Sequence, residues 1–248
     1  IWFDPATQWY APSKGKQGRN QTYSDAAIQC CLMIKSLFRL SLRMVTGFVQ
    51  SLIHLCGLNW IAPDYTTICR RQQHIDIVIS YQKSCDGLYL IVDSTGLKFL
   101  GEGEWKRKKH QPEYRRQWRK LHIGIDAKTL QIRAVQLTTN NVSDSQVLGD
   151  LLDQIPQDER VDSVYTDGAY DTKQCRQVIA DRQAHAVIPP RKNAKPWKDK
   201  KMGSLERNEL LRTVKRLGRT IWKKWSGYHR RSLVETKMHC IKLLGDKL

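Results

Sequence analysis

The stretch that most limits how this chain can fold is Leu88-Tyr-Leu-Ile-Val92, a continuous apolar run that ends at Asp93. A run of this length after Gly87 is typical of a strand that is buried on both faces of a sheet. Its side chains alternate between the two faces, so both faces need an apolar cover. The run therefore predicts a layered α/β domain with this strand at the centre of its sheet.

Strand-like and helix-like patterns alternate in the residues that follow. We expect a hairpin between the second and third strands, and a helix that begins after Ser143 and ends at Pro156. The remaining elements are a fourth strand, a second helix, a fifth strand and long helices, at 161–166, 172–182, 185–188 and beyond. The order β-β-β-α-β-α-β predicts a ribonuclease-H-like α/β fold with a mixed sheet over residues 87–248.

The residues before this domain have a different character. Residues 1–23 show no periodicity and are expected to form an extended arm, whereas residues 24–80 contain three helical patterns. Ser24 and Ser41 can cap the first two helices, and the third carries Arg70 and Arg71. Three short helices with arginines on the last indicate a helix-turn-helix-like module that binds DNA through these two residues. A bundle that only packs on the catalytic domain is the alternative.

The charge of the chain indicates a polyanionic partner. Lys and Arg number 42 against 24 Asp and Glu, which gives a net charge of +18. Nucleic acid is the expected partner, although ribosome-associated and membrane-surface proteins are also basic. The segment 105–120 mixes eight basic residues with aromatic ones, so it is either a DNA-binding segment or a solvated loop. The DNA-binding candidates in it are Lys106, Arg107, Lys108, Lys109, Arg115 and Arg116.

Other sequence features bear on metal, membrane and compartment. The seven cysteines include no C-x-x-C pair, which argues against a zinc site. The most apolar stretch, residues 30–58, is interrupted by charged side chains, so no membrane partner is expected. No signal peptide is recognisable, and we expect a cytoplasmic protein associated with the bacterial nucleoid. Because the chain starts at Ile1 and stops abruptly after Leu248, it looks like an internal piece of a longer reading frame.

Two aspartates occupy equivalent places in the predicted sheet. Asp93 ends the first strand and Asp167 ends the fourth, so both can meet a common ligand if these strands are parallel neighbours. A strand-ending aspartate is more often a turn or helix cap. For Asp126, at a hairpin tip, and Asp171, in the turn after Asp167, we favour that structural role.

A third acidic residue lies in a polar stripe near the C-terminus. On one helix, Tyr228, Arg231, Glu235 and Lys242 would project within a narrow sector. A solvated face with an Arg231–Glu235 pair is the simpler reading. It does not explain the flanking apolar face at 234, 238 and 241, which would press this helix onto the sheet.

These residues carry a family resemblance. The spacing Tyr-x2-Arg-x3-Glu-x6-Lys is met at residues 228, 231, 235 and 242 without a gap or substitution. The stretches Val-Asp93-Ser-Thr-Gly-Leu-Lys and Tyr-Thr-Asp167-Gly-Ala-Tyr-Asp are similar to two aspartate motifs of the same family. The chain thus resembles insertion-sequence transposases of the acidic-triad (DDE) class, in the group around insertion sequence five.

The resemblance implies a specific chemistry. A transposase of this class cleaves the ends of its element and joins the 3′-hydroxyl to target DNA. The implied catalytic and metal-binding residues are Asp93, Asp167 and Glu235. Two Mg²⁺ ions, with Mn²⁺ as a substitute, fit three carboxylates.

The resemblance also implies DNA contacts for Tyr228, Arg231 and Lys242. Terminal inverted repeats and target DNA are the implied partners, and joining two ends suggests a homodimer or larger assembly. The alternative is a truncated, inactive copy that occupies element ends and interferes with a full-length transposase.

Overall fold

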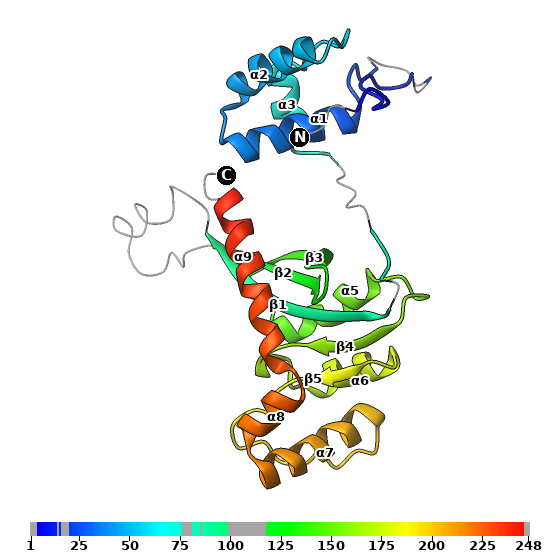
Figure 1. Cartoon of the computed structure of the whole chain (residues 1–248), viewed down its shortest axis with the longest axis vertical. Coiled ribbons are helices and arrows are strands. Elements are labelled where there is room, and N and C mark those ends of the chain that lie inside the picture. Colours follow the sequence, from blue (N-terminus) through cyan, green and yellow to red (C-terminus); the bar gives the residue numbers. More distant parts are fainter. Residues whose placement is uncertain are drawn as a thin grey trace, which may run out of the picture. The chain divides into compact units, whose positions relative to one another are not determined.

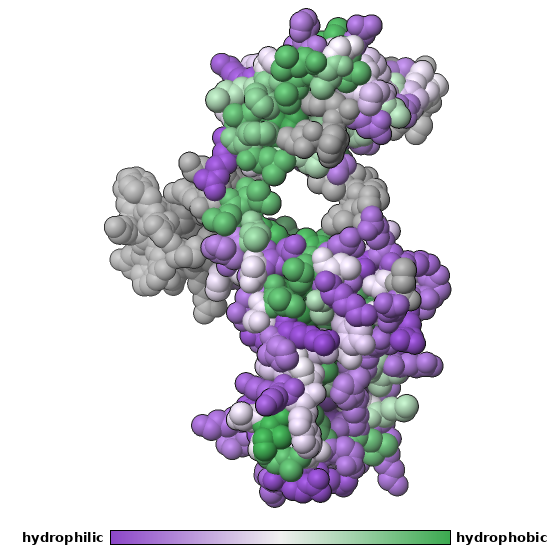
Figure 2. Space-filling model, viewed as in Figure 1, coloured by the Kyte–Doolittle hydropathy of each residue, from purple (hydrophilic) through white to green (hydrophobic). Residues whose placement is uncertain are grey.

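The computed structural model describes residues 4–13, 15, 20–75, 81–84, 86–98 and 118–245. The chain divides into two compact units, one within Ile1–Ser80 and one that begins at Tyr81 (Figure 1). We call the first the helical unit and the second the sheet unit. On the face shown in Figure 2, hydrophilic residues cover most of the sheet unit, whereas apolar residues gather over the helical unit.

The helical unit is built from α1 (Asp25–Phe38), α2 (Leu42–Leu55) and α3 (Tyr65–Arg71). Each helix begins at a side chain that accepts a backbone N–H one turn ahead, as an N-cap does. The acceptors are Ser24, Ser41 and Asp64. The three predicted helices and the capping roles of Ser24 and Ser41 are therefore confirmed. Their buried faces share one core, formed by Ala27, Ile28, Cys31, Ile34, Val45, Val49, Ile53 and Ile68.

The described part of residues 1–23 packs against these helices. Trp9 is 2% exposed, and its ring stacks on Trp60 at a centroid distance of 4.9 Å. The indole Nε1 donates to the carbonyl of Ile61 at 2.9 Å. Tyr10 and Tyr23 form an isolated antiparallel bridge. The aromatic residues near the start of the chain thus belong to the core and rim of the helical unit.

Five strands form the sheet unit's single described sheet, in the order β3-β2-β1-β4-β5. Their bounds are β1 (Leu88–Lys98), β2 (Trp118–Asp126), β3 (Ile132–Thr139), β4 (Val161–Tyr165) and β5 (His185–Val187). The β1–β2 and β2–β3 pairs are antiparallel, and the β1–β4 and β4–β5 pairs are parallel. This mixed sheet with β1 at its centre has the ribonuclease-H-like topology that the order of elements predicted.

Both faces of the sheet are covered, as the apolar run in β1 required. Leu90 and Val92 point to the face of α5 (Asp144–Asp153) and α6 (Lys173–Asp181) and share a core with those helices. Ile91 points to the other face, where it shares a core with Val234 and Met238 of α9 (Ser232–Gly245). The predicted pressing of the C-terminal helix onto the sheet is confirmed.

The predicted end of β1 at Asp93 is wrong. The parallel pairing with β4 stops at Ile91↔Tyr165, but the antiparallel pairing with β2 continues to Lys98↔Trp118. The apolar pattern ends where β4 ends, because beyond that point β1 is covered less completely. Backbone hydrogen bonds to β2 do not require apolar side chains, so β1 continues through polar residues. Asp93 therefore lies within a strand and just beyond the last β4 partner.

The polar stripe near the C-terminus does not lie on one helix. After α7 (Met202–Leu217) and α8 (Arg219–Trp225), a 3₁₀ turn η2 (Tyr228–Arg231) precedes α9. Gly227 adopts a left-handed conformation with φ 65° and separates α8 from this turn. The prediction that Tyr228 and Arg231 share a helix with Glu235 is corrected, since both residues lie in η2. Among the described residues, no helix combines the length and apolar character needed to cross a membrane.

Candidate active site

Asp93 and Asp167 lie beyond the parallel-paired ends of neighbouring strands. Asp93 comes two residues after Ile91, the last residue of β1 that pairs with β4, and Asp167 comes two residues after the end of β4. The Asp93 carboxylate accepts the Ser94 N–H at 2.9 Å. Because β1 and β4 are parallel, the two aspartates lie at the same edge of the sheet, as predicted.

Asp167 is held by a short turn that follows β4. It caps the 3₁₀ turn η1 (Gly168–Tyr170), and its Oδ1 accepts the Ala169 N–H at 2.9 Å. The carbonyl of Asp167 accepts the N–H of Tyr170 at 3.3 Å. The conformation of η1 therefore determines where the Asp167 carboxylate points.

Arg231 connects Asp93 to Glu235. Its Nη1 donates to Asp93 Oδ2 at 2.7 Å, and its Nη2 donates to Glu235 Oε1 at 2.7 Å. Asp93 and Arg231 are 138 positions apart in the chain, so this contact depends on the tertiary fold. The Glu235 side chain is 59% exposed, whereas that of Asp93 is 16% exposed. The site thus brings together two of the predicted acidic residues and the predicted arginine.

The pKa of Asp93 depends on the charges of both other acidic residues. Burial raises the pKa of Asp93, and the negative charges of Asp167 and Glu235 raise it further. The Ser94 N–H and the Arg231 guanidinium act in the opposite direction but do not reverse the shift. Three carboxylates that repel one another in a partly buried site favour a cation between them.

The donor chemistry fits a hard divalent ion. Carboxylate oxygens are preferred ligands of Mg²⁺ and Mn²⁺. Across the described residues, no three His, Cys, Asp or Glu side chains already form a cage of metal-binding geometry. Arg231 bonds Asp93 and Glu235, so an ion at this site would compete with the guanidinium for their oxygens.

The other predicted residues of the C-terminal stripe, Tyr228 and Lys242, differ in solvent exposure. Tyr228 is half-buried, its ring lies 5.8 Å from that of Trp222, and Lys223 Nζ lies 5.3 Å from its centroid. Burial raises the pKa of Tyr228, so the phenol stays protonated at neutral pH. Lys242 is exposed, seven residues beyond Glu235, or about 10 Å along the axis of α9.

The predicted DNA-binding arginines of the helical unit differ from each other. Arg71 pairs with Asp25 and donates to the carbonyl of Tyr23 at 3.0 Å, and its side chain is only 16% exposed. Arg70 donates to Thr66 within its own helix and is exposed. Arg71 thus links α3 to α1, whereas Arg70 faces solvent. The remaining predicted DNA-binding residues, Lys106, Arg107, Lys108, Lys109, Arg115 and Arg116, lie outside the described residues.

The two aspartates expected to be structural have that role. Asp126 accepts hydrogen bonds from the Lys128 N–H, the Thr129 hydroxyl and Arg133 at 2.9, 2.8 and 3.2 Å. Asp171 is fully buried and accepts from Arg176 and Arg207, each at 2.9 Å. Sequence patterns did not reveal these arginine partners, because Arg133, Arg176 and Arg207 lie in elements where a charged residue would be expected at the surface.

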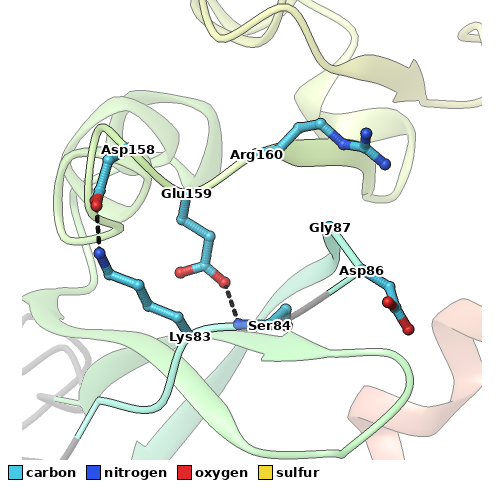
Figure 3. Close-up of a pocket in the computed structure, with 7 residues that line it drawn as sticks. All are labelled: Lys83, Ser84, Asp86, Gly87, Asp158, Glu159 and Arg160. Carbon is cyan, nitrogen blue, oxygen red and sulfur yellow. Dashed lines mark hydrogen bonds and ion pairs between the residues drawn. The ribbon is translucent and has the colours of Figure 1, made fainter.

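A polar pocket lies at the opposite edge of the sheet (Figure 3). It has a volume of about 510 Å³ and is lined by residues that precede β1 and β4. Its charged side chains are already partnered: Lys83 with Asp158, Arg160 with Asp162, and Glu159 with the Ser84 N–H at 2.9 Å. The buried Glu159 also accepts from the Tyr81 hydroxyl. These contacts fasten residues 81–84 to the sheet, at the edge away from Asp93 and Asp167.

Several solved structures share a limited likeness with this chain. A chain of the simian T-cell lymphotropic virus intasome in complex with PP2A regulatory subunit B56 gamma is 18% identical, with a TM-score of 0.29, over 70% of this chain and 59% of that chain. The present chain thus spans less than two thirds of the length of that chain.

Two Mos1 structures are similar at the same level. The Mos1 transposase paired-end complex with left transposon end is 8% identical, with a TM-score of 0.29, over 84% of this chain and 82% of that one. The Mos1 mariner paired-end complex with Mn is 10% identical, with a TM-score of 0.30, over 95% and 82%.

Family models give the stronger result. A model described as "Transposase DDE domain" matches residues 85–246, and a second with the same description matches residues 1–102. The first match covers more than half of the chain and includes Asp93, Asp167 and Glu235. The chain therefore belongs to the family of transposases with a DDE domain.

Proposed function

We propose that this transposase cleaves the ends of an insertion element and joins the freed 3′-hydroxyl to target DNA, using Asp93, Asp167 and Glu235. The observation that carries the proposal is that one guanidinium, that of Arg231, bonds carboxylates from β1 and α9, while the charge of Asp167 in the turn after β4 acts on both Asp93 and Arg231. These elements are far apart in the sequence, and a purely structural ion pair would not need three mutually repelling acids.

Membership of the DDE family implies chemistry that depends on a divalent metal. We assign Mg²⁺ as the ion, with Mn²⁺ as its substitute, because all three donors are carboxylates. When bound, two such ions would supply an activated attacking oxygen and would neutralise charge on the scissile phosphate. Asp93 and Asp167 would hold the ions from the sheet edge, and Glu235 would hold them from α9.

The cationic side chains around the acids have separate roles in this proposal. Arg231 balances the carboxylates and can turn to a DNA phosphate when metal binds, because its planar fork suits both partners. Tyr228, still protonated, donates its hydroxyl to the DNA strand beside the cut. Lys242 is too far along α9 to ligate the ion and contacts a phosphate farther from the scissile bond. The spacing of these residues supports our assignment of the chain to the insertion sequence five group.

The helical unit and the basic segment would hold the rest of the DNA. Arg70, which is exposed at the end of α3, would contact the terminal inverted repeat, and the predicted basic residues of segment 106–116 would contact phosphates. Arg71 contributes by fixing α3 on α1. Joining two ends calls for a homodimer or larger synaptic assembly, and a DNA substrate supports our expectation of a protein associated with the bacterial nucleoid.

The proposal is tested by incubating the chain with labelled element-end DNA and Mg²⁺, and by separating binding, nicking and joining on one gel. Asp93→Ala, Asp167→Ala and Glu235→Ala should each abolish nicking and joining while binding persists, because ligand loss leaves the basic surface intact. Binding without nicking by the parent chain would instead support an inactive copy that occupies element ends. Nicking without joining would indicate a nuclease.

A further inference from the structure

The turn that carries Asp167 is held from outside by a residue to which the proposed chemistry assigns no role. Arg191 follows β5 and the prolines at 189 and 190. Its Nε donates to the carbonyl of Gly168 at 3.2 Å, and its Nη2 donates to the carbonyl of Ala169 at 2.9 Å. These are two consecutive carbonyls of η1, so one guanidinium grips the turn through its backbone.

Those carbonyls need a partner from outside the turn. A helical turn leaves its last carbonyls without intrahelical donors, and a basic side chain near them is favourable. The Gly168 carbonyl receives a bond from the Asp171 N–H at 3.2 Å in addition to that from Arg191. Arg191 thereby completes the bonding of a turn that is only three residues long.

The backbone of Arg191 is itself anchored to the buried core. Its N–H donates to Asp171 Oδ2 at 3.3 Å, and Asp171 is fixed by the buried Arg176 and Arg207. A methyl group on Gly168 would lie 3.4 Å from the Pro189 carbonyl, so the segment before Arg191 passes directly over the turn. The side chain of Arg191 therefore bonds η1 itself, and its backbone bonds Asp171 at the end of that turn.

We propose that Arg191 is a positioning residue for Asp167: its grip on the Gly168 and Ala169 carbonyls fixes the direction of the Asp167 carboxylate and hence its distance from Asp93. The Gly168 carbonyl, which Arg191 bonds, and the Ala169 N–H, which bonds the Asp167 carboxylate, belong to the same peptide group. This inference rests on the metal role proposed for Asp167. Partners that orient metal ligands typically contribute about 10-fold to 100-fold to metal affinity.

Arg182 provides a matched control in the same unit. Its guanidinium also donates to two consecutive backbone carbonyls, those of Ile155 at 3.4 Å and Pro156 at 3.0 Å. This contact lies in the connection that leads into β4, at the edge of the sheet away from Asp167. Arg182→Ala thus removes the same kind of bond without touching η1. Lys192→Ala controls for the loss of one positive charge beside Arg191.

The test measures binding of Mn²⁺ to the whole chain by electron paramagnetic resonance, without DNA, for the parent, Arg191→Ala, Arg191→Lys, Arg182→Ala, Lys192→Ala and Asp167→Asn. Arg191→Ala should weaken Mn²⁺ binding about 10-fold or more. Arg191→Lys should recover only part of the loss, since an ammonium can donate to these carbonyls but lacks the planar fork of the guanidinium. Arg182→Ala and Lys192→Ala should bind Mn²⁺ as the parent does.

Two further measurements test the positioning role of Arg191 independently of Mn²⁺ affinity. In nicking assays, Arg191→Ala should raise the Mg²⁺ concentration for half-maximal rate more than it lowers the rate at saturating Mg²⁺. Hydrogen exchange of residues 167–172 should speed up in Arg191→Ala and not in Arg182→Ala. Equal Mn²⁺ affinities for Arg191→Ala and Arg182→Ala would overturn the positioning role. Equal affinities for the parent and Asp167→Asn would overturn the proposed metal site itself, and the inference with it.

Discussion

Two carboxylate–arginine clusters in the sheet unit use the same residue types to opposite effect. In one, Asp171 is fully buried and is bonded by Arg176 and Arg207. In the other, Asp93 is partly exposed and is bonded by Arg231, which also holds Glu235. Burial acts to raise the pKa of both acids. The hydrogen bonds and charges of two arginines overcome that effect at Asp171 and lower its pKa, whereas the pKa of Asp93 stays raised.

The difference shows how an acidic residue with a structural role can be distinguished from one that is available to bind a ligand. Asp171 has more positive partners than negative neighbours, so its charge is satisfied within the fold. Asp93 shares one arginine with Glu235, and the charge of Asp167 also acts on it, so three carboxylates are set against one bonded guanidinium. An excess of this kind is expected where a cationic ligand belongs.

The largest expected difference between the clusters is in catalysis. Asp93→Asn should abolish nicking of element-end DNA in Mg²⁺, because the amide is a much poorer metal ligand than the carboxylate. Its free energy of unfolding should stay within about 1 kcal/mol of the parent, as for other partly exposed ion pairs. Urea unfolding and the nicking assay measure the two effects. Normal nicking by this variant would remove Asp93 from the active site.

The second expected difference is in stability. Asp171→Asn leaves the buried Arg176 and Arg207 without their carboxylate, and breaking a buried ion pair in this way costs about 3–5 kcal/mol. Urea unfolding should show this loss, and Asp93→Asn is the matched comparison. A variant as stable as the parent would mean that the two guanidiniums find other acceptors, and the contrast between the clusters would lose its physical basis.

Acidification should change the contributions of Asp171 and Asp93 to the free energy of unfolding in opposite directions. The pKa of Asp171 is lowered in the folded state, so its stabilisation is complete above its ordinary value of 3.8 and is lost as pH falls through the lower folded value. The pKa of Asp93 is raised, so its charged form destabilises the fold at neutral pH, and protonation relieves this as pH falls. Each pKa unit corresponds to about 1.4 kcal/mol.

Urea unfolding at a series of pH values between 6 and 3 checks these signs. Compared with the parent, Asp171→Asn should show a smaller loss of stability on acidification. Asp93→Asn should gain stability relative to the parent at neutral pH, and this gain should shrink as the parent's Asp93 is protonated. The same slope for all three proteins would contradict the assignment of opposite shifts.

The smallest expected effect concerns a charge outside both clusters. Lys242→Ala should lower the slope of log affinity for element-end DNA against log salt by about 1, the effect of one phosphate contact. Lys128→Ala is the control, because Lys128 lies in the turn between β2 and β3 at the opposite edge of the sheet. If both variants keep the parent's slope, Lys242 belongs to a solvated face of α9.

Local patterns in the sequence predicted the elements well. The helix starts at Ser24, Ser41 and Ser143 follow from capping chemistry within three residues, and the Ser143 box with Gln146 is formed. The central strand followed from its apolar run. Patterns of this kind can be recognised in the sequence because the interacting groups are neighbours in the chain.

Features that depend on distant partners could not be predicted in the same way. The continuation of β1 past Asp93 requires β2, and the break at η2 reflects the left-handed Gly227 together with the contact of Arg231 to a strand 138 residues earlier. The role of Arg191 depends on carbonyls, which carry no sequence signal at all. Family resemblance supplied the triad, while the arrangement around it came from the fold.

The continuation of β1 also sets a length. Asp93 is five residues from Lys98, where β1 and β2 last pair, and a strand rises about 3.4 Å per residue. Lys98 and Trp118, the last pair of β1 and β2, therefore lie about 17 Å from Asp93 along the paired strands. This length corresponds to about five nucleotide steps of duplex DNA. If the basic segment contacts DNA as we propose, removing two residue pairs from these strands should move the protein's outer footprint about two nucleotides closer to the cut.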